Sequence, residues 1–292
     1  MAIEKGYGVR ESDLPWVDIG VRPGYNQRYH GFFDKEKGVG ARLGSLHAEP
    51  YYHSPRHRHT FQQMRYVVSG HMRYGDNPVY GPGDCLFLPE SVHYGPIKPV
   101  NRTEGEHLHF VDMQFMGPSG IPYPDPDEVV AAQRALKETG TFEEGVYTFS
   151  DGHKRDAYEA ILEKVIGTPL SYAPPRMTEP VVMRTPAYPS LPHPRLKAVT
   201  QKHLGFFFDI GPNFKQYTLP EGSVIPAGKP VGHRALFLLS GELSFGGESF
   251  SALSYFLFPN DTEHAALEAR SDCTLLVLGW ALPGGRMPFE LF

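Results

Sequence analysis

The chain repeats its own pattern, and this repeat limits the fold more than any other feature of the sequence. Three motifs of the first half return in the second half: Gly31-Phe32-Phe33 as Gly205-Phe206-Phe207, Val67-Val68-Ser69-Gly70 as Leu238-Leu239-Ser240-Gly241, and Leu86-Phe87-Leu88-Pro89 as Phe256-Leu257-Phe258-Pro259. Their spacing agrees as well, because Gly70 and His93 lie 23 positions apart, as do Gly241 and His264. The repeat predicts two domains of one fold in tandem.

The first copy contains a segment that we expect to be a β-strand with several polar side chains on one face. Residues 60–68 are rich in β-formers and follow a His-x-His motif. Side chains alternate between the two faces of a strand, so His57, His59, Gln63 and Arg65 would share one face. The 31 glycines and 28 prolines are scattered along the chain, which is typical of the many turns in sandwiches and barrels.

A second segment of the first copy would bring another histidine to the same place. A turn at Gly81-Pro82-Gly83-Asp84 precedes the apolar run Cys85–Leu88, and His93 follows. The His-x-His motif, Gln63, Gly70 and this second segment together resemble the two paired motifs of the cupin superfamily. The resemblance implies a double-stranded β-helix barrel, jelly-roll-like in form, that holds a divalent metal ion through three His and one Glu side chain.

This resemblance implies that His57, His59, Gln63 and His93 are the metal ligands. Gln63 stands at the position of the family's Glu, and the step from Pro89 to His93 is one residue shorter than the commonest spacing. A neutral amide gives less charge to a metal ion than a carboxylate does. Gln63 would therefore be either a weak ligand or a neighbour of a three-histidine set.

The run His57-Arg58-His59-Thr60, with Arg65-Tyr66-Val67 soon after it, is also similar to the gentisate-type ring-cleaving dioxygenases, which are tandem cupins. That similarity implies three histidine ligands without the Glu. We expect one divalent ion per chain. Fe(II) is favoured because three histidines leave positions open for substrate and O₂, and Zn, Mn, Ni and Co are the alternatives.

Further polar side chains are expected around the metal ion. Arg65 shares the ligand face, and a buried guanidinium needs an anion, either an acidic substrate or an internal Asp or Glu. His107 and His109 form a second His-x-His that is predicted to face inward, either as hydrogen-bonded structural residues or as acid–base groups. Tyr51 and His53 precede the first motif and are expected at the barrel mouth as substrate-binding residues. The inward prediction for the two histidines rests on strand parity, which groups them with Val111, Met113 and Phe115, opposite Asp112 and Gln114.

The second copy lacks the ligand set. At the spacing of the first copy, Gly228, Pro230 and Arg234 replace the two histidines and the glutamine, which leaves His264 alone. A single imidazole does not hold a metal ion. The second barrel is therefore expected to be structural, an oligomerisation platform, a lid for the first site or the binding site of a separate small molecule.

The sequence between the two copies predicts a partly helical, Pro-rich connector. Helical spacing over residues 127–137 and 154–166 indicates two amphipathic helices, ended by Gly140 and Gly167, and a proline-rich stretch covers residues 169–194. The predicted fold is all-β dominated, with an N-terminal metal-binding barrel at 1–121, the connector at 122–195 and a C-terminal degenerate barrel at 196–292.

Composition limits the classes of partner. The net charge of −5, with 40% hydrophobic and 21% charged residues, is ordinary for a soluble globular protein and argues against a nucleic-acid groove. No apolar run approaches the ~20 residues that span a bilayer, and the first residues show no signal segment. Cys85 and Cys273 fall in predicted core strands of different halves, so no disulfide is expected.

We expect a cytoplasmic protein that binds a small anionic substrate, neither nucleic acid nor membrane. A homodimer or higher homo-oligomer is expected because the resemblance implies it and exposed strand edges favour pairing.

Three functions agree with these patterns. The favoured one is an Fe(II) dioxygenase that cleaves a small aromatic or enol-containing acid. A metal-dependent lyase, isomerase or decarboxylase would instead use the ion as a Lewis acid and His107 or His109 as the base. A non-catalytic protein that binds a sugar or a small acid is the third, since a fold does not determine a function.

Overall fold

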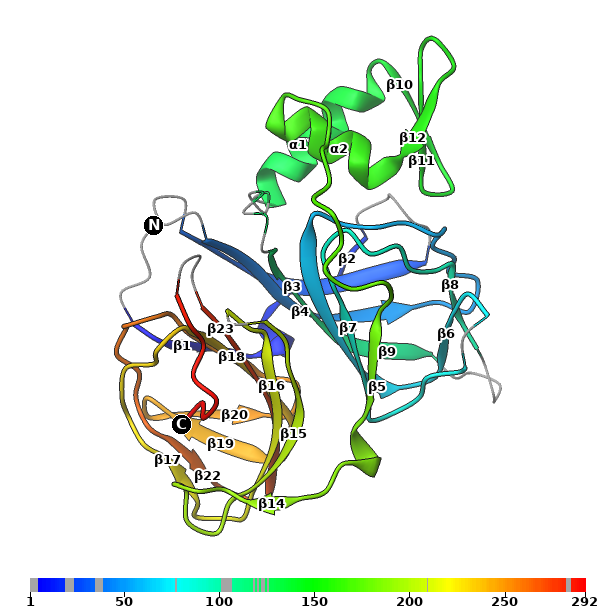
Figure 1. Cartoon of the computed structure of the whole chain (residues 1–292). Coiled ribbons are helices and arrows are strands. Elements are labelled where there is room, and N and C mark those ends of the chain that lie inside the picture. Colours follow the sequence, from blue (N-terminus) through cyan, green and yellow to red (C-terminus); the bar gives the residue numbers. More distant parts are fainter. Residues whose placement is uncertain are drawn as a thin grey trace. The chain divides into compact units, whose positions relative to one another are not determined.

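The computed structural model describes residues 5–18, 24–34, 39–76, 78–100, 107–117, 119, 121, 124, 126–208, 210–281 and 285–292. The chain divides into two compact units (Figure 1). The first barrel unit is Trp16–Val182, and the second barrel unit is Met1–Pro15 together with Met183–Phe292. Most of the predicted connector therefore belongs to the first barrel unit, and the N-terminal residues belong to the second.

The first barrel unit contains a seven-stranded sheet and a two-stranded sheet. The seven strands, in order across the sheet, are β13 (Val181–Arg184), β7 (Asp84–Leu88), β5 (Phe61–Ser69), β9 (Leu108–Met116), β4 (Val39–Ala48), β3 (Tyr25–Asp34) and β2 (Val17–Asp18). The smaller sheet pairs β6 (Met72–Tyr74) with β8 (Ile97–Pro99). Strand β5 lies between β7 and β9 and is antiparallel to both, so the strand predicted at 60–68 is confirmed as a central strand.

Both faces of this sheet are buried, and only one of them faces the barrel interior. The interior core includes Val67, Leu86, Leu88, Leu108 and Phe110. On β9 the interior face is therefore that of Phe110 and Asp112, while His109 lies on the opposite face with Val111 and Met113. The predicted inward face of this strand was wrong. Hydrophobicity could not mark the interior because almost every residue of β5 and β9 is buried.

A helical insert completes the first barrel unit. It consists of α1 (Pro126–Lys137), the three-stranded sheet of β10 (Gly140–Glu143), β11 (Val146–Phe149) and β12 (Lys154–Asp156), and α2 (Ala157–Ile166). Asp156 caps α2, since its side chain accepts from the backbone N–H groups of Tyr158 and Glu159, and Gly167 ends it with a φ of 76°. Both predicted helices are confirmed, except that residues 154–156 form a strand.

The second barrel unit repeats the plan with a seven-stranded and a four-stranded sheet. The larger sheet has the order β1 (Tyr7–Val9), β21 (Tyr255–Phe258), β18 (His233–Ser240), β23 (Cys273–Trp280), β16 (Asn213–Leu219), β15 (Thr200–Phe206) and β14 (Leu191–Pro192). The smaller sheet has the order β17 (Val224–Ile225), β22 (Leu267–Ala269), β19 (Glu242–Phe245) and β20 (Glu248–Ser251). Aliphatic and aromatic side chains from both sheets form one core.

Strand register confirms most of the repeat. Gln63 of β5 pairs with Leu88, and Arg234 of β18 pairs with Phe258, each just before a proline. Just outside the sheets, His57 forms a bridge with Tyr94, and Gly228 forms the matching bridge with His264. The counterpart of His264 in the first barrel is therefore Tyr94, and not the neighbouring His93.

Cys85 and Cys273 are both buried and free, as expected. Among the described residues, no helix is long and apolar enough to cross a membrane.

Candidate functional site

His57 and His59 are buried side by side just before β5 begins. Their ring centroids lie 4.9 Å apart, and the ring of Tyr94 lies 4.5 Å from His57 and 5.7 Å from His59. Two backbone hydrogen bonds join His57 to Tyr94. Nδ1 of His57 lies 2.6 Å from the carbonyl oxygen of Pro55, and a neutral ring that donates there is the tautomer whose acceptor nitrogen is Nε2.

His93 lies apart from this pair, and its side chain is exposed. The chain turns at Ser91, whose φ is 67°, and the residue that returns to the barrel interior is Tyr94, at 4% exposure. Tyr94 follows Pro89 by five positions, and His264 follows its own proline by the same step. The short spacing noted in the sequence was thus the signal that Tyr94, rather than His93, occupies the fourth position.

Gln63 is enclosed in the barrel, and hydrogen bonds fix its amide group. Nε2 donates to both carboxylate oxygens of Asp112, at 2.9 and 3.0 Å. Oε1 accepts from the hydroxyl group of Tyr94 at 3.0 Å. The carboxylate therefore turns the amide oxygen toward the tyrosine that contacts both histidines, and it shifts electron density toward that oxygen.

Arg65 forms an ion pair with a carboxylate inside the protein. Nε donates to Oδ1 of Asp112 at 3.2 Å, and Nη1 donates to the hydroxyl group of Tyr74 at 2.7 Å. The side chains of Arg65 and Asp112 are only 4% and 6% exposed. Of the two partners expected for Arg65, the structure supplies the internal carboxylate, which already neutralises its charge.

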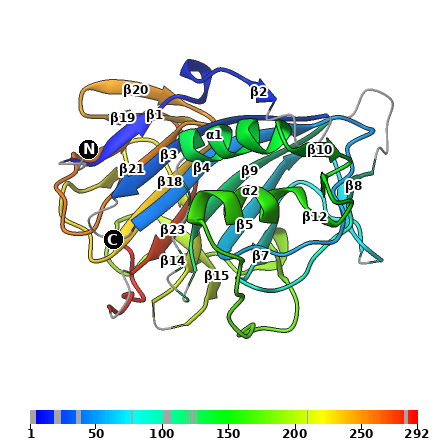
Figure 2. The ribbon, with the colours of Figure 1, turned by 90° about the horizontal axis from the view of Figure 1, so that it is seen from above.

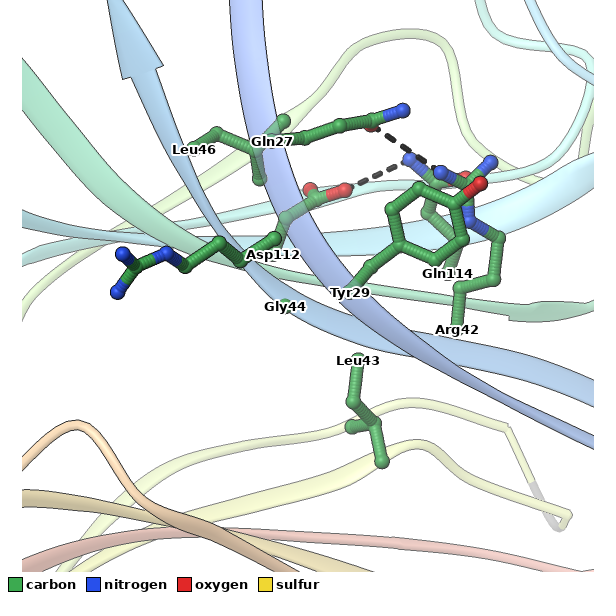
Figure 3. Close-up of a pocket in the computed structure, with 9 residues that line it drawn as sticks. Gln27, Tyr29, Arg42, Leu43, Gly44, Leu46, Asp112 and Gln114 are labelled. Atoms are coloured by element: carbon green, nitrogen blue, oxygen red, sulfur yellow. Dashed lines mark hydrogen bonds between the residues drawn. The ribbon is translucent and has the colours of Figure 1, made fainter. Parts of the chain in front are cut away.

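A small cavity lies behind Asp112. Figure 3 shows the cavity there, where Arg42 donates to Oε1 of Gln27 at 3.1 Å and Gln114 donates to Asp112 at 2.7 Å. The cavity measures about 10 Å³, which is room for a single water molecule at most.

Helix α2 contributes an aromatic cover beside His59. The ring of Tyr158 lies edge-on to His59 at 5.2 Å and to Phe61 at 5.9 Å, and Figure 2 looks down on α1 and α2 with strands of the first barrel beneath them. The hydroxyl group of Tyr158 is enclosed and has no hydrogen-bond partner among the described residues. Burial raises the pKa of Tyr158, so the group stays a proton donor.

The remaining predicted site residues lie elsewhere. His107 is 58% exposed with Nδ1 3.6 Å from Glu49, while Tyr51 and His53 are exposed. His109 lies on the face of β9 opposite the barrel interior, where its ring contacts His47 at a centroid distance of 4.4 Å. Neither His107 nor His109 is positioned beside the His57 and His59 pair, which corrects their expected role as acid–base groups.

The side chains gathered around Tyr94 offer nitrogen and oxygen donors of the kinds that bind metal ions. Within the described ranges, no three His, Cys, Asp or Glu side chains come together as a metal-binding group. The donors present are instead the imidazoles of His57 and His59, the amide oxygen of Gln63 and the phenol of Tyr94. The hydrogen bond from His57 to a backbone carbonyl and the carboxylate behind Gln63 are supports of the kind that orient metal ligands.

Three residues around the candidate site, Tyr94, Asp112 and Tyr158, were not among the site residues predicted from the sequence. Tyr94 had a signal in the proline spacing. Strand parity places Asp112 on the outward face of its strand, and Tyr158 lies within a predicted amphipathic helix without a signal of its own. Neither role shows in sequence, because each depends on which segments the fold brings together.

Comparisons with known proteins identify the fold. No protein-family model and no curated protein sequence matches this chain. Solved structures match nearly its whole length. A "putative dioxygenase" from Nostoc punctiforme is 10% identical, with a TM-score of 0.65 and coverage of 96% of this chain and 84% of that one. Oxalate decarboxylase from Bacillus subtilis is 13% identical, with a TM-score of 0.57 and coverage of 97% and 78%.

A third match adds a structure with a bound metal ion. HEPD from Streptomyces albus, with its substrate 2-hydroxyethylphosphonate and Fe(II) bound, is 13% identical, with a TM-score of 0.53 and coverage of 95% of this chain and 76% of that one. At such identities the likeness shows the fold alone. The tandem cupin fold expected from the sequence is thus confirmed, and its structural neighbours include metal-dependent enzymes.

Proposed function

We propose that this tandem cupin is a mononuclear metal enzyme whose first barrel holds one divalent ion, Fe(II) by preference, on His57, His59 and Gln63. The observation that carries the proposal is the contact of Tyr94 with both histidines and, through its hydroxyl group, with the amide oxygen of Gln63. We further propose that the enzyme is a dioxygenase that cleaves a small aromatic or enol-containing acid.

The donor set supports Fe(II). Iron oxygenases use two histidines and one carboxylate on one side of the ion, which leaves other positions open, and here the neutral amide oxygen of Gln63 would take the place of the carboxylate. When bound, Fe(II) would supply O₂ activation and chelation of the substrate. The Fe(II) in HEPD and the dioxygenase named among the structural neighbours agree with this choice.

The surrounding residues would position the substrate and exclude water. Asp112 holds the Gln63 amide in one orientation, so its oxygen is available without rearrangement. Tyr158 keeps its proton and has an unused hydroxyl group over His59, and an enclosed donor of this kind is stabilised when a bound molecule accepts from it. We propose that Tyr158 donates to the substrate.

The charge of the substrate would be recognised at the rim rather than by Arg65. Partial burial, followed by the positive charges of Arg58 and Arg56, lowers the pKa of His93, while the nearby carboxylate of Glu159 acts in the opposite direction. Basic groups near a site entrance raise the local concentration of anions. These residues support an anionic substrate.

The metal content of matched variants tests the proposal. The wild-type protein, stripped with a chelator and reloaded with Fe(II) under anaerobic conditions, should bind one ion per chain. His57→Ala should lose it, while His93→Ala, the matched control, should keep it because His93 faces the solvent. Circular dichroism would check that both variants are folded. Equal loss of metal in the two variants would contradict the proposed ligand set.

The reaction class needs a second measurement. The Fe(II) protein should consume O₂ with at least one member of a panel of catechols, gentisate-like acids and diketones. Absence of iron at the site together with absence of O₂ uptake across the panel would overturn the dioxygenase proposal.

A non-redox lyase, isomerase or decarboxylase is the second candidate. It is favoured by two phenol groups, Tyr94 and Tyr158, that lie beside His59 and could move protons without O₂. Turnover under anaerobic conditions with Zn or Mn, at the rate seen in air, would select this candidate over the dioxygenase.

A further inference from the structure

The second barrel contains the larger of the two pockets described here. It measures about 400 Å³, a size typical of small-molecule sites. Its walls come from the loop Pro226–Val231, from Arg234 and His264, and from the C-terminal segment 288–292. All of these residues belong to the second barrel unit.

This pocket occupies the place that the candidate metal site has in the first barrel. Gly228, Pro230 and Arg234 stand where the first barrel has its two histidines and its glutamine, and His264 stands where it has Tyr94. A glycine, a proline and a guanidinium do not bind a metal ion. The pocket is therefore suited to a different ligand.

Arg234 is a buried cation without a carboxylate partner. It is 3% exposed, and its hydrogen bonds go to the backbone carbonyls of Leu291, at 2.5 Å, and Val231, at 3.1 Å. Burial lowers its pKa to about 10, and among the described residues no ion pair offsets that burial. In the first barrel, the buried guanidinium of Arg65, two positions after the counterpart of Arg234, does have a carboxylate partner. A buried charge is stable when an anion accompanies it.

Other groups on the wall strengthen the positive charge. Arg195 and Lys229 line the pocket, are exposed and form no ion pair within the described residues. Glu290 is the one acidic residue in the lining, and the ammonium group of the buried Lys215, 2.9 Å away, already neutralises it. An anion that entered the pocket would thus meet cations whose charge is not otherwise used.

The space beside His264 is left open by a glycine. Nδ1 of His264 lies 2.9 Å from the carbonyl oxygen of Ala265, and its Nε2 would lie 3.9 Å from a Cβ atom placed on Gly228, with nothing else within 4 Å of that position. A side chain at 228 would therefore project into open pocket space. The apolar part of the wall, Pro226, Ala227, Pro230, Val231, Leu291 and Phe292, suits a ligand with a hydrocarbon body.

We infer that the pocket of the second barrel is a binding site for a small organic carboxylate, with Arg234 as the group that binds its carboxylate and His264 beside it. The apolar wall favours an organic acid over inorganic phosphate, since phosphate has no surface to bury there. The site is independent of the metal proposed for the first barrel.

Calorimetric titration of the full-length protein with benzoate tests the inference, with benzamide as the uncharged match and inorganic phosphate as the competing anion. Benzoate should bind, and benzamide and phosphate should bind at least about 10-fold more weakly, because an arginine–carboxylate hydrogen bond is worth roughly that factor or more. Titrations with oxalate and succinate would show how the binding affinity depends on the size of the hydrocarbon part of the acid.

Two variants locate the binding. Arg234→Gln should weaken benzoate about 10- to 100-fold. Gly228→Leu should block the pocket without touching Arg234, and it should fold because the position has open space. Arg270→Gln removes a surface charge outside the pocket and is the control. His57→Ala should keep the second-barrel binding, which separates this site from the first barrel.

The inference is overturned if benzoate does not bind, if phosphate binds as well as benzoate, or if binding is unchanged in Gly228→Leu. Loss of benzoate binding in His57→Ala with retention in Gly228→Leu would place the acid in the first barrel and would likewise overturn it.

Discussion

The position of Tyr94 shows the chemical difference between the two barrels. Tyr94 in the first barrel and His264 in the second form matching bridges, yet one contacts two histidines and a glutamine while the other faces a glycine. The hydroxyl group of Tyr94 is the link between the histidine pair and Gln63. Its role can be tested by removing that one atom.

Tyr94→Phe should weaken metal binding while leaving the fold intact. The ring contacts with His57 and His59 remain, and only the hydrogen bond to Gln63 is lost. Loss of a group that orients a ligand typically costs about 10- to 100-fold in metal affinity. Competition against a chelator of known affinity measures this, and an unchanged affinity would mean that Tyr94 does not support the site.

Asp112→Ala should destabilise the protein strongly. The substitution removes the carboxylate that accepts from Gln63, Arg65 and Gln114, so it leaves a buried guanidinium without its anion. Breaking such a buried pair costs about 3–5 kcal/mol in unfolding free energy. Urea unfolding measures the loss, and Glu268→Gln, which breaks the exposed pair with Arg270, should cost less than about 1 kcal/mol. Similar losses in the two variants would contradict this account.

The sequence predicted that His57, His59 and Gln63 belong to one site. It also predicted His93 as the fourth residue, whereas the structure has the next residue, Tyr94, in that place. Alternation along a strand predicts which side chains share a face, and Gln63 and Arg65 do, since both donate to Asp112. The segment after Pro89 is a turn, where Ser91 adopts a left-handed conformation, so simple alternation does not apply there.

At the scale of elements, β9 shows why the interior face could not be read from the sequence. All but two of its nine residues are buried, so both faces have the same hydrophobic character. His109 was grouped correctly with its apolar neighbours, but their face is not the one that lines the barrel interior. The polar groups of the interior, Asp112 and Gln114, looked like surface residues.

The placement of His109 predicts a pH dependence of stability. Its burial, followed by the effects of His47 and Arg28, lowers the pKa of His109 to about 4. Between the unfolded value near 6.5 and about 4, the unfolded chain binds a proton that the folded chain does not, so stability falls as the pH falls. In the His109→Phe variant, the decrease in unfolding free energy between pH 7.5 and pH 4.5 should be smaller by up to roughly 3 kcal/mol. Urea unfolding at pH 7.5 and 4.5 tests this, and an equal loss in both proteins would contradict it.

Helix α2 should depend on its N-terminal cap. Asp156 accepts from two backbone N–H groups, and Asp156→Ala should cost about 1 kcal/mol, whereas Asp156→Asn should cost less because it retains an acceptor. Because Tyr158 lies in the same first turn, hydrogen exchange of its amide should rise in the alanine variant. No change in exchange would show that packing alone holds this turn.

At the scale of the whole molecule, the repeat was the part of the structure most completely predictable. Two copies of one motif predict two similar barrels. The absence of the ligand residues from the second copy predicts that the two barrels differ in chemistry. The pairing of β1 with β21 could not be predicted, because it joins the N-terminal segment to a strand near the other end of the chain. We therefore propose that the two barrels differ in function, so that the first barrel binds a metal ion and the second does not.

Anomalous scattering from crystals of the Fe(II)-loaded protein tests this division most directly. We predict one iron peak per chain, within bonding distance of His57, His59 and Gln63, and no peak beside Arg234 and His264 in the second barrel. A peak bound by His93, a peak in the second barrel, or the absence of any peak from fully loaded protein would contradict it.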